Sequence, residues 1–234
     1  FRRIDLEGMP MINADANLVT NTQRGTCLEK NGVTIQTCEH VLAALVGLEI
    51  DNAIIELSTS EPPIMDGSSK YFIEALESAG TVEQEAYREV FVVKDVISYS
   101  DEETGSEITV IPSDEYQVTT MVDFGTKVLG TQNATLQNLS NFKYEISESR
   151  TFSFLHELEM LLEHGLIKGG DLNNAIVYVD KPISKQTMER LKVAFNKDSI
   201  SVKANGILDN LTLHYPNEAA RHKLLDVIGD LALI

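Results

Sequence analysis

The sequence predicts an α+β fold of two domains with similar structures, each a β-sheet packed on α-helices and related by internal duplication. The chain has 234 residues, more than a single hydrophobic core usually holds. Strand-like and helix-like segments are mixed along it in a layered pattern. The order helix, strand, helix also occurs twice, once in each half, and a repeated order of elements indicates duplication.

The first half contains two predicted helices with a strand between them. The helix over 39–47 follows Thr37, which can cap it, and its residues from Val41 onward are apolar almost all round. A helix with this composition is expected to be buried. The run DNAIIEL at 51–57 is strand-like, and the second helix, over 68–80, follows a Pro-Pro pair.

The second half repeats this order. The stretch 89–100 alternates between apolar and polar residues like a strand, and a helix is predicted over 153–165, where Gly165 suits the position after a helix end. The run NNAIVYV at 173–179 is nearly a copy of DNAIIEL. The alternative to duplication is that these two short runs are alike by chance.

The boundary between the two predicted domains lies in the polar segment 81–89, which reads as a linker. The first domain is therefore placed at 1–85 and the second at 86–234. The chain begins without Met and ends inside an apolar helix, so we expect it to be a piece of a longer protein, shortened at both ends.

Composition argues against several classes of protein. The formal net charge is −17, whereas a nucleic-acid-binding protein usually carries the opposite balance. No apolar run is long enough to span a bilayer. Cys27 and Cys38 are the only cysteines, too few for a disulfide framework or a cysteine-based zinc site. Two free thiols suit a reducing compartment, so we expect the protein to be cytoplasmic.

The last helix carries a narrow polar stripe. At about 100° of rotation per residue, His222, Lys223, Asp226 and Asp230 lie within about 100° of one another, and the apolar side chains occupy the opposite arc. A histidine and an aspartate one turn apart can bind the same ion. The alternative is an ion pair on a face exposed to solvent.

A zinc site needs a third protein ligand, because catalytic sites use three protein groups and leave one position open. His40 is the best candidate, since it begins a buried helix, and its neighbour Glu39 could take a proton from water. The alternative is that Glu39 only favours the positive end of the helix and His40 caps a backbone group. The remaining histidines are expected to be structural or solvated: His156, His164 and His214.

Together these segments resemble the UDP-3-O-acyl-N-acetylglucosamine deacetylases of lipid A biosynthesis. The matching segments are TCEHVLAAL, EPPIMDGSS, SRTFSF, the run from LIKGG to NNAIV, and RHKLLDVIGDL, in the family's order and across nearly the whole chain. The resemblance implies two α+β domains and Zn²⁺ as cofactor. It also implies hydrolysis of the 2-acetamido group of a UDP-linked acylated amino sugar, with release of acetate.

The resemblance further implies the roles of the site residues. His40, His222 and Asp226 correspond to the zinc ligands, and Glu39 corresponds to the general base that takes the proton of the attacking water. Glu39 is thereby a catalytic residue of the expected site.

Three further residues match catalytic positions of the family. Lys223 and the hydroxyl of Thr151 are expected to stabilise the charged intermediate, and Asp230 is expected to orient a further catalytic histidine. In relatives that histidine follows the last helix in a Gly-His motif, and the sequence stops before it. We expect the parent protein to supply it.

Substrate contacts are expected from four other residues. Phe152 is predicted to line the passage for the acyl chain, and Lys168, Gly169 and Gly170 are predicted to place a cation and backbone amides near the substrate. The alternatives are core packing for Phe152 and a simple glycine-rich turn for the other three. The Asp66-Gly67 pair is expected to be a turn or cap without a chemical role.

One stretch points to a larger parent protein. Residues 185–213 stand where relatives often have a shorter connection, and their pattern resembles members fused to a 3-hydroxyacyl-carrier-protein dehydratase. We therefore expect a fused dehydratase in the parent. Two rival functions stay open: a zinc amidohydrolase for another N-acyl substrate, and a non-catalytic scaffold with the same fold.

Overall fold

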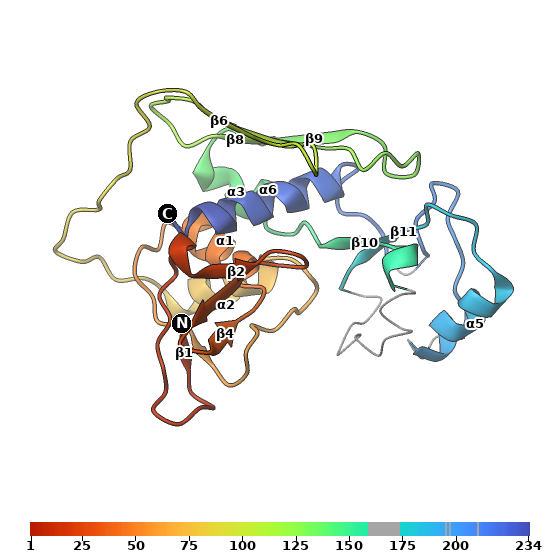
Figure 1. Ribbon diagram of the computed structural model, residues 1–234, viewed down its shortest axis with the longest axis horizontal. Helices are drawn as coiled ribbons and strands as arrows, with labels where there is room; N and C mark the ends of the chain where they lie inside the picture. Colours follow the sequence, from red (N-terminus) through yellow and green to blue (C-terminus); the bar gives the residue numbers. More distant parts are fainter. Residues whose placement is uncertain (159–173, 195, 197, 210) are drawn as a thin grey trace.

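A long C-terminal helix, α6 (Glu218–Leu231), runs through the middle of the molecule. The computed structural model describes residues 1–158, 174–194, 196, 198–209 and 211–234. In Figure 1, α6 lies between a β-hairpin on its upper side and the helix α1 (Glu39–Gly47) on its lower side, and both termini lie on the left. The helices and sheets are mixed, so the α+β class predicted from the sequence is confirmed.

The N-terminal half consists of α1, a second helix and small sheets. Strands β2, β3 and β4 form an antiparallel sheet in that order, and β1 pairs in parallel with β5. Asn31 and Gly32 join β3 to β4 with positive φ angles of 54° and 78°, the backbone geometry that tight hairpins favour. The bounds are β1 Arg2–Arg3, η1 Ala16–Leu18, β2 Val19–Asn21, β3 Cys27–Lys30, β4 Val33–Ile35, β5 Glu56–Leu57 and α2 Lys70–Ala79.

The C-terminal half contains two antiparallel hairpins, β6–β7 and β8–β9, and one parallel pair, β10–β11. The hairpin β8–β9 packs on α6, whereas α5 lies beside β10–β11 at the other end of the molecule from the termini (Figure 1). The bounds are β6 Ile97–Asp101, β7 Ser106–Val110, β8 Val118–Val122, β9 Gln132–Leu136, η2 Leu139–Asn141, α3 Phe142–Glu145, β10 Phe152–Phe154, β11 Ile176–Tyr178 and α5 Lys185–Ala194.

The largest hydrophobic core is built from both halves of the chain. Ala43 and Ala44 of α1 belong to the same buried cluster as Leu224, Leu225 and Ile228 of α6. Small side chains on α1 let the two helices approach closely, and α6 contributes a glycine at the contact. A Cβ atom at Gly229 would overlap the backbone carbonyl of Glu39. The start of α1 is therefore held directly against α6.

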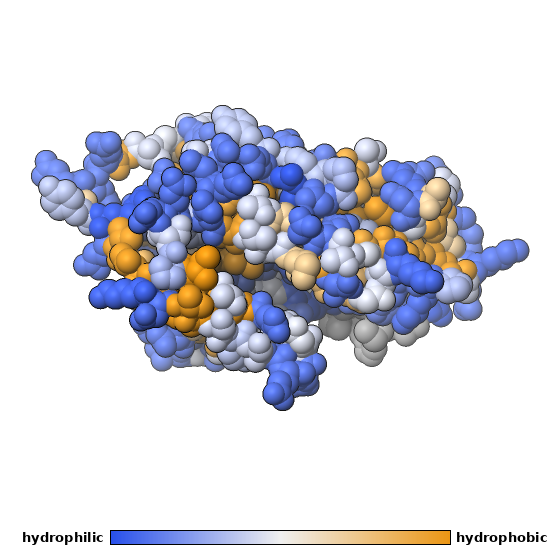
Figure 2. Space-filling model, turned by 90° about the horizontal axis from the view of Figure 1, so that it is seen from above, coloured by the Kyte–Doolittle hydropathy of each residue, from blue (hydrophilic) through white to orange (hydrophobic). Residues whose placement is uncertain are grey.

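Apolar side chains also remain on the surface. In Figure 2 the hydrophobic residues are interspersed among polar ones on the face seen from above. On the β6–β7 hairpin Tyr99 pairs with Ile108 across the strands, and both side chains are exposed. Within the described part of the chain, no helix has both the length and the hydropathy that crossing a membrane requires.

The helix predictions for the first half hold. The helix predicted over 39–47 is α1, with the same bounds, and the helix predicted over 68–80 is α2, Lys70–Ala79. The helix predicted over 153–165 is wrong at its start, because Phe152–Phe154 is strand β10 and helical structure begins at residue 155. Residues 159–165 of that prediction lie outside the described residues.

Two strand predictions are largely wrong. Of the segment 51–57 only Glu56–Leu57 is a strand, and of the segment 89–100 only residues 97–100 are, as part of β6. An alternating pattern forms a strand only where a neighbouring strand accepts its hydrogen bonds, and residues 89–96 pair with no strand of the described chain. The strand predicted over 173–179 is the shorter β11, and residue 173 is not described.

The close contact between α1 and α6 predicts that Gly229→Ala lowers the stability of the protein, the opposite of what this substitution usually does inside a helix. Replacing an exposed glycine inside a helix by alanine usually stabilises a protein by about 1 kcal/mol. At residue 229 we expect a loss of about 1–3 kcal/mol, because the added methyl group would collide with the carbonyl of Glu39. Urea denaturation measures the difference.

The control is Ser78→Ala, at an exposed position of α2, which we expect to change stability by less than about 0.5 kcal/mol. A stabilising Gly229→Ala would show that the two helices do not depend on this glycine.

Candidate active site

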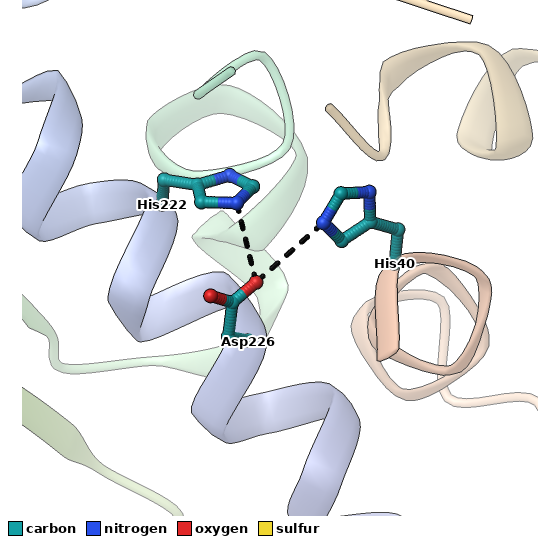
Figure 3. A group of neighbouring side chains, drawn as sticks. All are labelled: His40, His222 and Asp226. Atoms are coloured by element: carbon teal, nitrogen blue, oxygen red, sulfur yellow. Dashed lines mark ion pairs between the residues drawn. The ribbon is translucent and has the colours of Figure 1, made fainter. Parts of the chain in front are cut away.

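Three buried or nearly buried side chains converge where α1 meets α6. His40 is the second residue of α1, and His222 and Asp226 are one turn apart on α6. Figure 3 shows both imidazole rings pointing at the same carboxylate oxygen. The Nε2 atoms of His222 and His40 lie 3.3 Å and 3.6 Å from Oδ1 of Asp226. The structure thus brings together the three residues that the sequence analysis selected as ligands.

The geometry of the three side chains is compact. The two rings meet edge to face, with centroids 5.0 Å apart and an angle of 85° between their planes. One potential ligand atom from each residue lies within 4.8 Å of those of the other two. Among the described residues, this is the one group of histidine, cysteine and acidic side chains with such spacing.

A backbone carbonyl sets the orientation of His222. Its Nδ1 atom lies 3.0 Å from the carbonyl oxygen of Ser149, and since a carbonyl can only accept, Nδ1 carries the proton. The lone pair is then on Nε2, the atom that faces Asp226. A hydrogen bond of this kind on the far nitrogen is what fixes the tautomer of a histidine that binds metal.

Nearby charges favour an ionised Asp226, and burial favours a neutral His222. Burial opposes ionisation of Asp226, but His222, His40 and Lys223 outweigh it and hold the pKa of the carboxyl well below its usual range. The Nζ atom of Lys223 lies 2.8 Å from Oδ2. Burial lowers the pKa of His222 to about 4. A carboxylate and a neutral imidazole are the forms that bind metal.

The residues present fit a zinc ion on their own geometry. Oδ1 of Asp226 is buried, and no hydrogen-bond donor in the described part of the protein reaches it. A buried carboxylate oxygen without a partner is unfavourable, and a cation between the three side chains would satisfy it. Two imidazole nitrogens and one carboxylate oxygen are ligands that Zn²⁺ commonly takes, with a fourth position left for water or substrate.

Glu39 lies beside this cluster and is held by a loop that the sequence analysis missed. The backbone N–H of Thr26 donates to Oε2 of Glu39 at 2.9 Å, and the Thr26 hydroxyl donates to Oδ1 of Asp230 at 2.6 Å. Burial raises the pKa of Glu39 above its ordinary value. One threonine therefore positions both the expected general base and Asp230, whose predicted role in orienting a further histidine stays a prediction.

Lys223 and Phe152 lie close to one another at the edge of the cluster. The Nζ atom of Lys223 is 5.8 Å from the centre of the Phe152 ring. Phe152 also meets Phe124 and Tyr178 edge to face, with ring centroids 5.6 Å and 5.9 Å away. These contacts favour core packing for one side of the ring, and the expected contact with the substrate stays a prediction.

Thr151 is fixed by its backbone just before β10. Its N–H donates to the carbonyl of Gly67 at 2.8 Å, and its own carbonyl accepts from Ile176 at 2.8 Å. Asp66 accepts from the backbone and side chain of Ser68, which confirms the structural role expected for that turn. Lys168, Gly169 and Gly170 lie outside the described residues, so their expected substrate contacts stay predictions.

The remaining histidines make ordinary structural contacts. His156 pairs with Asp180 at 3.0 Å, and His214 contacts the carbonyl of Glu148 at 2.9 Å through Nδ1. Both contacts agree with the structural role expected for these residues. His164 lies outside the described residues.

A buried ion pair next to the cluster was also missed. The Arg150 and Glu218 side chains approach to 2.9 Å and are 8% and 0% exposed. Glu218 is one turn before His222 and thus continues the polar stripe of the last helix, so helical periodicity could have indicated it. Arg150 gave no comparable signal, because its partner is distant in the sequence.

The fold and the site define an α+β protein with a buried two-histidine, one-aspartate cluster beside a carboxylate. A family model described as LpxC, UDP-3-O-acyl N-acetylglycosamine deacetylase, matches residues 1–195 and 186–234. The chain belongs to this family.

Curated relatives agree with that assignment. The bifunctional enzyme LpxC/FabZ of Bacteroides thetaiotaomicron is 46% identical over 234 residues, which cover 100% of this chain and 51% of that protein. The Porphyromonas gingivalis protein of the same name is 44% identical with the same coverage. The UDP-3-O-acyl-N-acetylglucosamine deacetylase of Saccharophagus degradans is 39% identical over 100% of this chain and 70% of that protein. The chain spans about half the length of the bifunctional relatives.

The low pKa of His222 predicts how stability depends on pH in the metal-free chain. The folded protein binds this proton near pH 4, and the unfolded chain binds it near pH 6.5. The unfolded state therefore carries more protons in between, and the free energy of unfolding falls as the pH drops through this range, by at most about 3 kcal/mol.

We expect His222→Asn to flatten this part of the profile in urea denaturation at a series of pH values. His214→Asn, at the surface, is the control and should keep it. An unchanged profile in His222→Asn would contradict the assignment of a neutral, buried imidazole.

Proposed function

We propose that this chain carries the catalytic centre of a zinc-dependent deacetylase. The substrate is UDP-3-O-(3-hydroxyacyl)-N-acetylglucosamine, and hydrolysis of its 2-acetamido group releases acetate, the committed step of lipid A biosynthesis. The observation that carries the proposal is the buried cluster of His40, His222 and Asp226, with Glu39 beside it, in a chain of this family. The name of the Saccharophagus degradans relative, UDP-3-O-acyl-N-acetylglucosamine deacetylase, supports the same substrate.

Zinc would be held by the two Nε2 atoms and by Oδ1 of Asp226. When bound, the ion supplies Lewis-acid chemistry: it polarises a carbonyl oxygen and makes water acidic enough to react near neutral pH. The protein keeps two of the three ligands in the form that binds, since burial keeps His222 neutral and the surrounding positive charge keeps Asp226 ionised. The carbonyl of Ser149 holds the His222 ring in place.

Glu39 takes the proton of the attacking water in this mechanism. Its raised pKa, caused first by burial, moves the carboxylate toward the range in which it can both accept and return a proton. The N–H of Thr26 fixes the orientation of the carboxylate. The water oxygen bonds to the amide carbon, the C–N bond breaks, and the departing amine receives the proton, from Glu39 or from the further histidine expected in the parent protein.

Lys223 contributes positive charge where the substrate oxygen becomes negative. Its ammonium group is tied to Asp226 and is therefore oriented before the reaction, which is the condition for effective electrostatic stabilisation. The Thr151 hydroxyl is proposed to assist it, as the resemblance to the family implies, and backbone hydrogen bonds to Gly67 and Ile176 fix the place of this residue. Phe152 would line the start of the acyl-chain passage.

Further proposals concern the protein as a whole. Relatives named bifunctional enzyme LpxC/FabZ support a parent with a fused dehydratase, and the cysteine content supports a cytoplasmic location. Internal duplication is supported by the parallel pairs β1–β5 and β10–β11, each of which has helical residues between its two strands. Domains at 1–85 and 86–234 follow from that duplication.

Metal analysis tests the proposed centre directly. We expect one zinc ion per chain, and we expect His222→Ala to weaken zinc binding by more than about 100-fold, since it removes a ligand. His214→Ala is the matched control and should bind zinc normally. A wild-type chain without zinc affinity would exclude the proposal and favour a non-catalytic scaffold.

The role of Glu39 is tested by Glu39→Gln in the parent protein. The amide keeps the shape of the side chain but cannot act as a base, so we expect zinc content to stay normal and turnover to fall by about 10²–10⁴-fold. Release of acetate from the UDP-linked substrate measures turnover. Near-normal turnover would show that another group is the base, and preference for an N-acyl substrate without a nucleotide would favour the rival amidohydrolase.

A further inference from the structure

One peptide group beside the site is held at both ends by the same helix. The carbonyl between Ser149 and Arg150 accepts from Nδ1 of His222 at 3.0 Å. The N–H of the same peptide group donates to Oε1 of Glu218 at 3.1 Å. Glu218 and His222 are one turn apart on α6, so successive turns of one helix anchor the nitrogen and the oxygen of one peptide plane.

The carboxylate of Glu218 is itself rigidly held. Its Oε1 also accepts from Nε of Arg150 at 2.9 Å, and its Oε2 accepts from the backbone N–H of His214 at 2.7 Å. The guanidinium donates further to the carbonyl of Thr212 at 2.6 Å. Glu218 is fully buried, so water does not compete for these positions, and both carboxylate oxygens have protein donors.

We propose that Glu218 is a positioning residue that sets the tautomer of His222 by fixing the peptide group between Ser149 and Arg150. With this peptide plane fixed, its carbonyl oxygen faces Nδ1 and accepts a hydrogen bond from the Nδ1–H group, and the lone pair of Nε2 faces Asp226. If the plane rotated, the other tautomer would compete and would place an N–H where a metal ion needs a lone pair. The inference rests on the proposed function insofar as His222 is a metal ligand.

Stability alone explains this arrangement poorly. A buried ion pair is weak support for stability, because removing two charges from water offsets most of their attraction, and apolar residues of similar volume often serve as well. If the side chains at positions 150 and 218 were apolar, the side chain at 218 could not accept a hydrogen bond from the backbone N–H of residue 150. What the pair adds, beyond filling space, is the direction of the Ser149 carbonyl.

The test compares Glu218→Gln with an exposed control. A glutamine at this position keeps one acceptor oxygen. Its NH₂ therefore faces either the two Arg150 donors that Oε1 now accepts or the His214 N–H that Oε2 now accepts, and in both orientations the hold on the peptide group is weakened. We expect Zn²⁺ alone, titrated in competition with a coloured chelator, to bind about 10–100-fold more weakly. Glu77→Gln removes the surface pair with Lys143 and should leave zinc affinity unchanged.

A second measurement needs no metal. In the metal-free chain at pH 7, ¹⁵N spectra of labelled histidines report which ring nitrogen of His222 carries the proton, with His222→Asn used to assign the signal. We expect Nδ1–H in the wild type and a mixture of tautomers in Glu218→Gln. A Glu218→Gln variant that is folded, with wild-type tautomer and zinc affinity, overturns the proposal and leaves the pair a structural role.

Arg150→Lys distinguishes the role of the Glu218 carboxylate from that of the ion pair. It also provides a test if Glu218→Gln does not fold. Lysine keeps the backbone N–H and a positive charge but loses the multiple contacts of the guanidinium. We expect reduced stability, the wild-type tautomer and zinc affinity within about threefold of wild type, because Glu218 still holds the peptide. Loss of the tautomer in Arg150→Lys would overturn the proposal. A wild-type chain that binds no zinc but keeps Nδ1–H would instead refute the proposed function alone.

Discussion

The close packing of α1 against α6 is the constraint on which the candidate site depends. Glu39 and His40 begin one helix, and His222 and Asp226 lie on the other, so no local segment contains the whole cluster. The helices approach closely because alanines line α1 and because Gly229 leaves room for the Glu39 carbonyl. A side chain at this one position would separate the two halves of the cluster, whatever the ligands themselves were.

The same contact concentrates ionisable groups in a region with little water. Burial acts on each of them, raising the pKa of Glu39 and lowering that of His222, while mutual attraction keeps Asp226 ionised. Such groups persist in a protein interior only when they are paired or bind an ion. The unpartnered Oδ1 of Asp226 is where the described residues leave this requirement unmet, and it points toward both histidines.

Sequence reasoning predicted the parts that depend on local pattern. The helix α1 was predicted with correct bounds because its composition is uniform, and the stripe on α6 follows from helical periodicity. The strand predicted over 89–96 does not form, because a strand needs a partner strand and the segment itself does not determine whether one is present. At 153–165 the pattern of a helix overlapped a strand, Phe152–Phe154, whose pairing with β11 is a long-range contact.

Within the site, the sequence predicted the side chains that lie on helices, but it did not predict the groups that hold them in place. Thr26 holds Glu39 through its backbone N–H, and Ser149 holds His222 through its carbonyl. Every residue type except proline has both groups, so the sequence does not indicate such contacts. Arg150 and Glu218 are far apart in the chain.

The two halves of the cluster also lie near opposite ends of the chain. The entropy of closing such a loop grows only with the logarithm of its length, so doubling the intervening length costs only about 0.6 kcal/mol. Segments between α1 and α6, such as the exposed stretch 81–91, can therefore gain or lose residues during evolution with little penalty to the assembly of the centre. Variation in length is expected there. Where the two helices touch, only small side chains are expected.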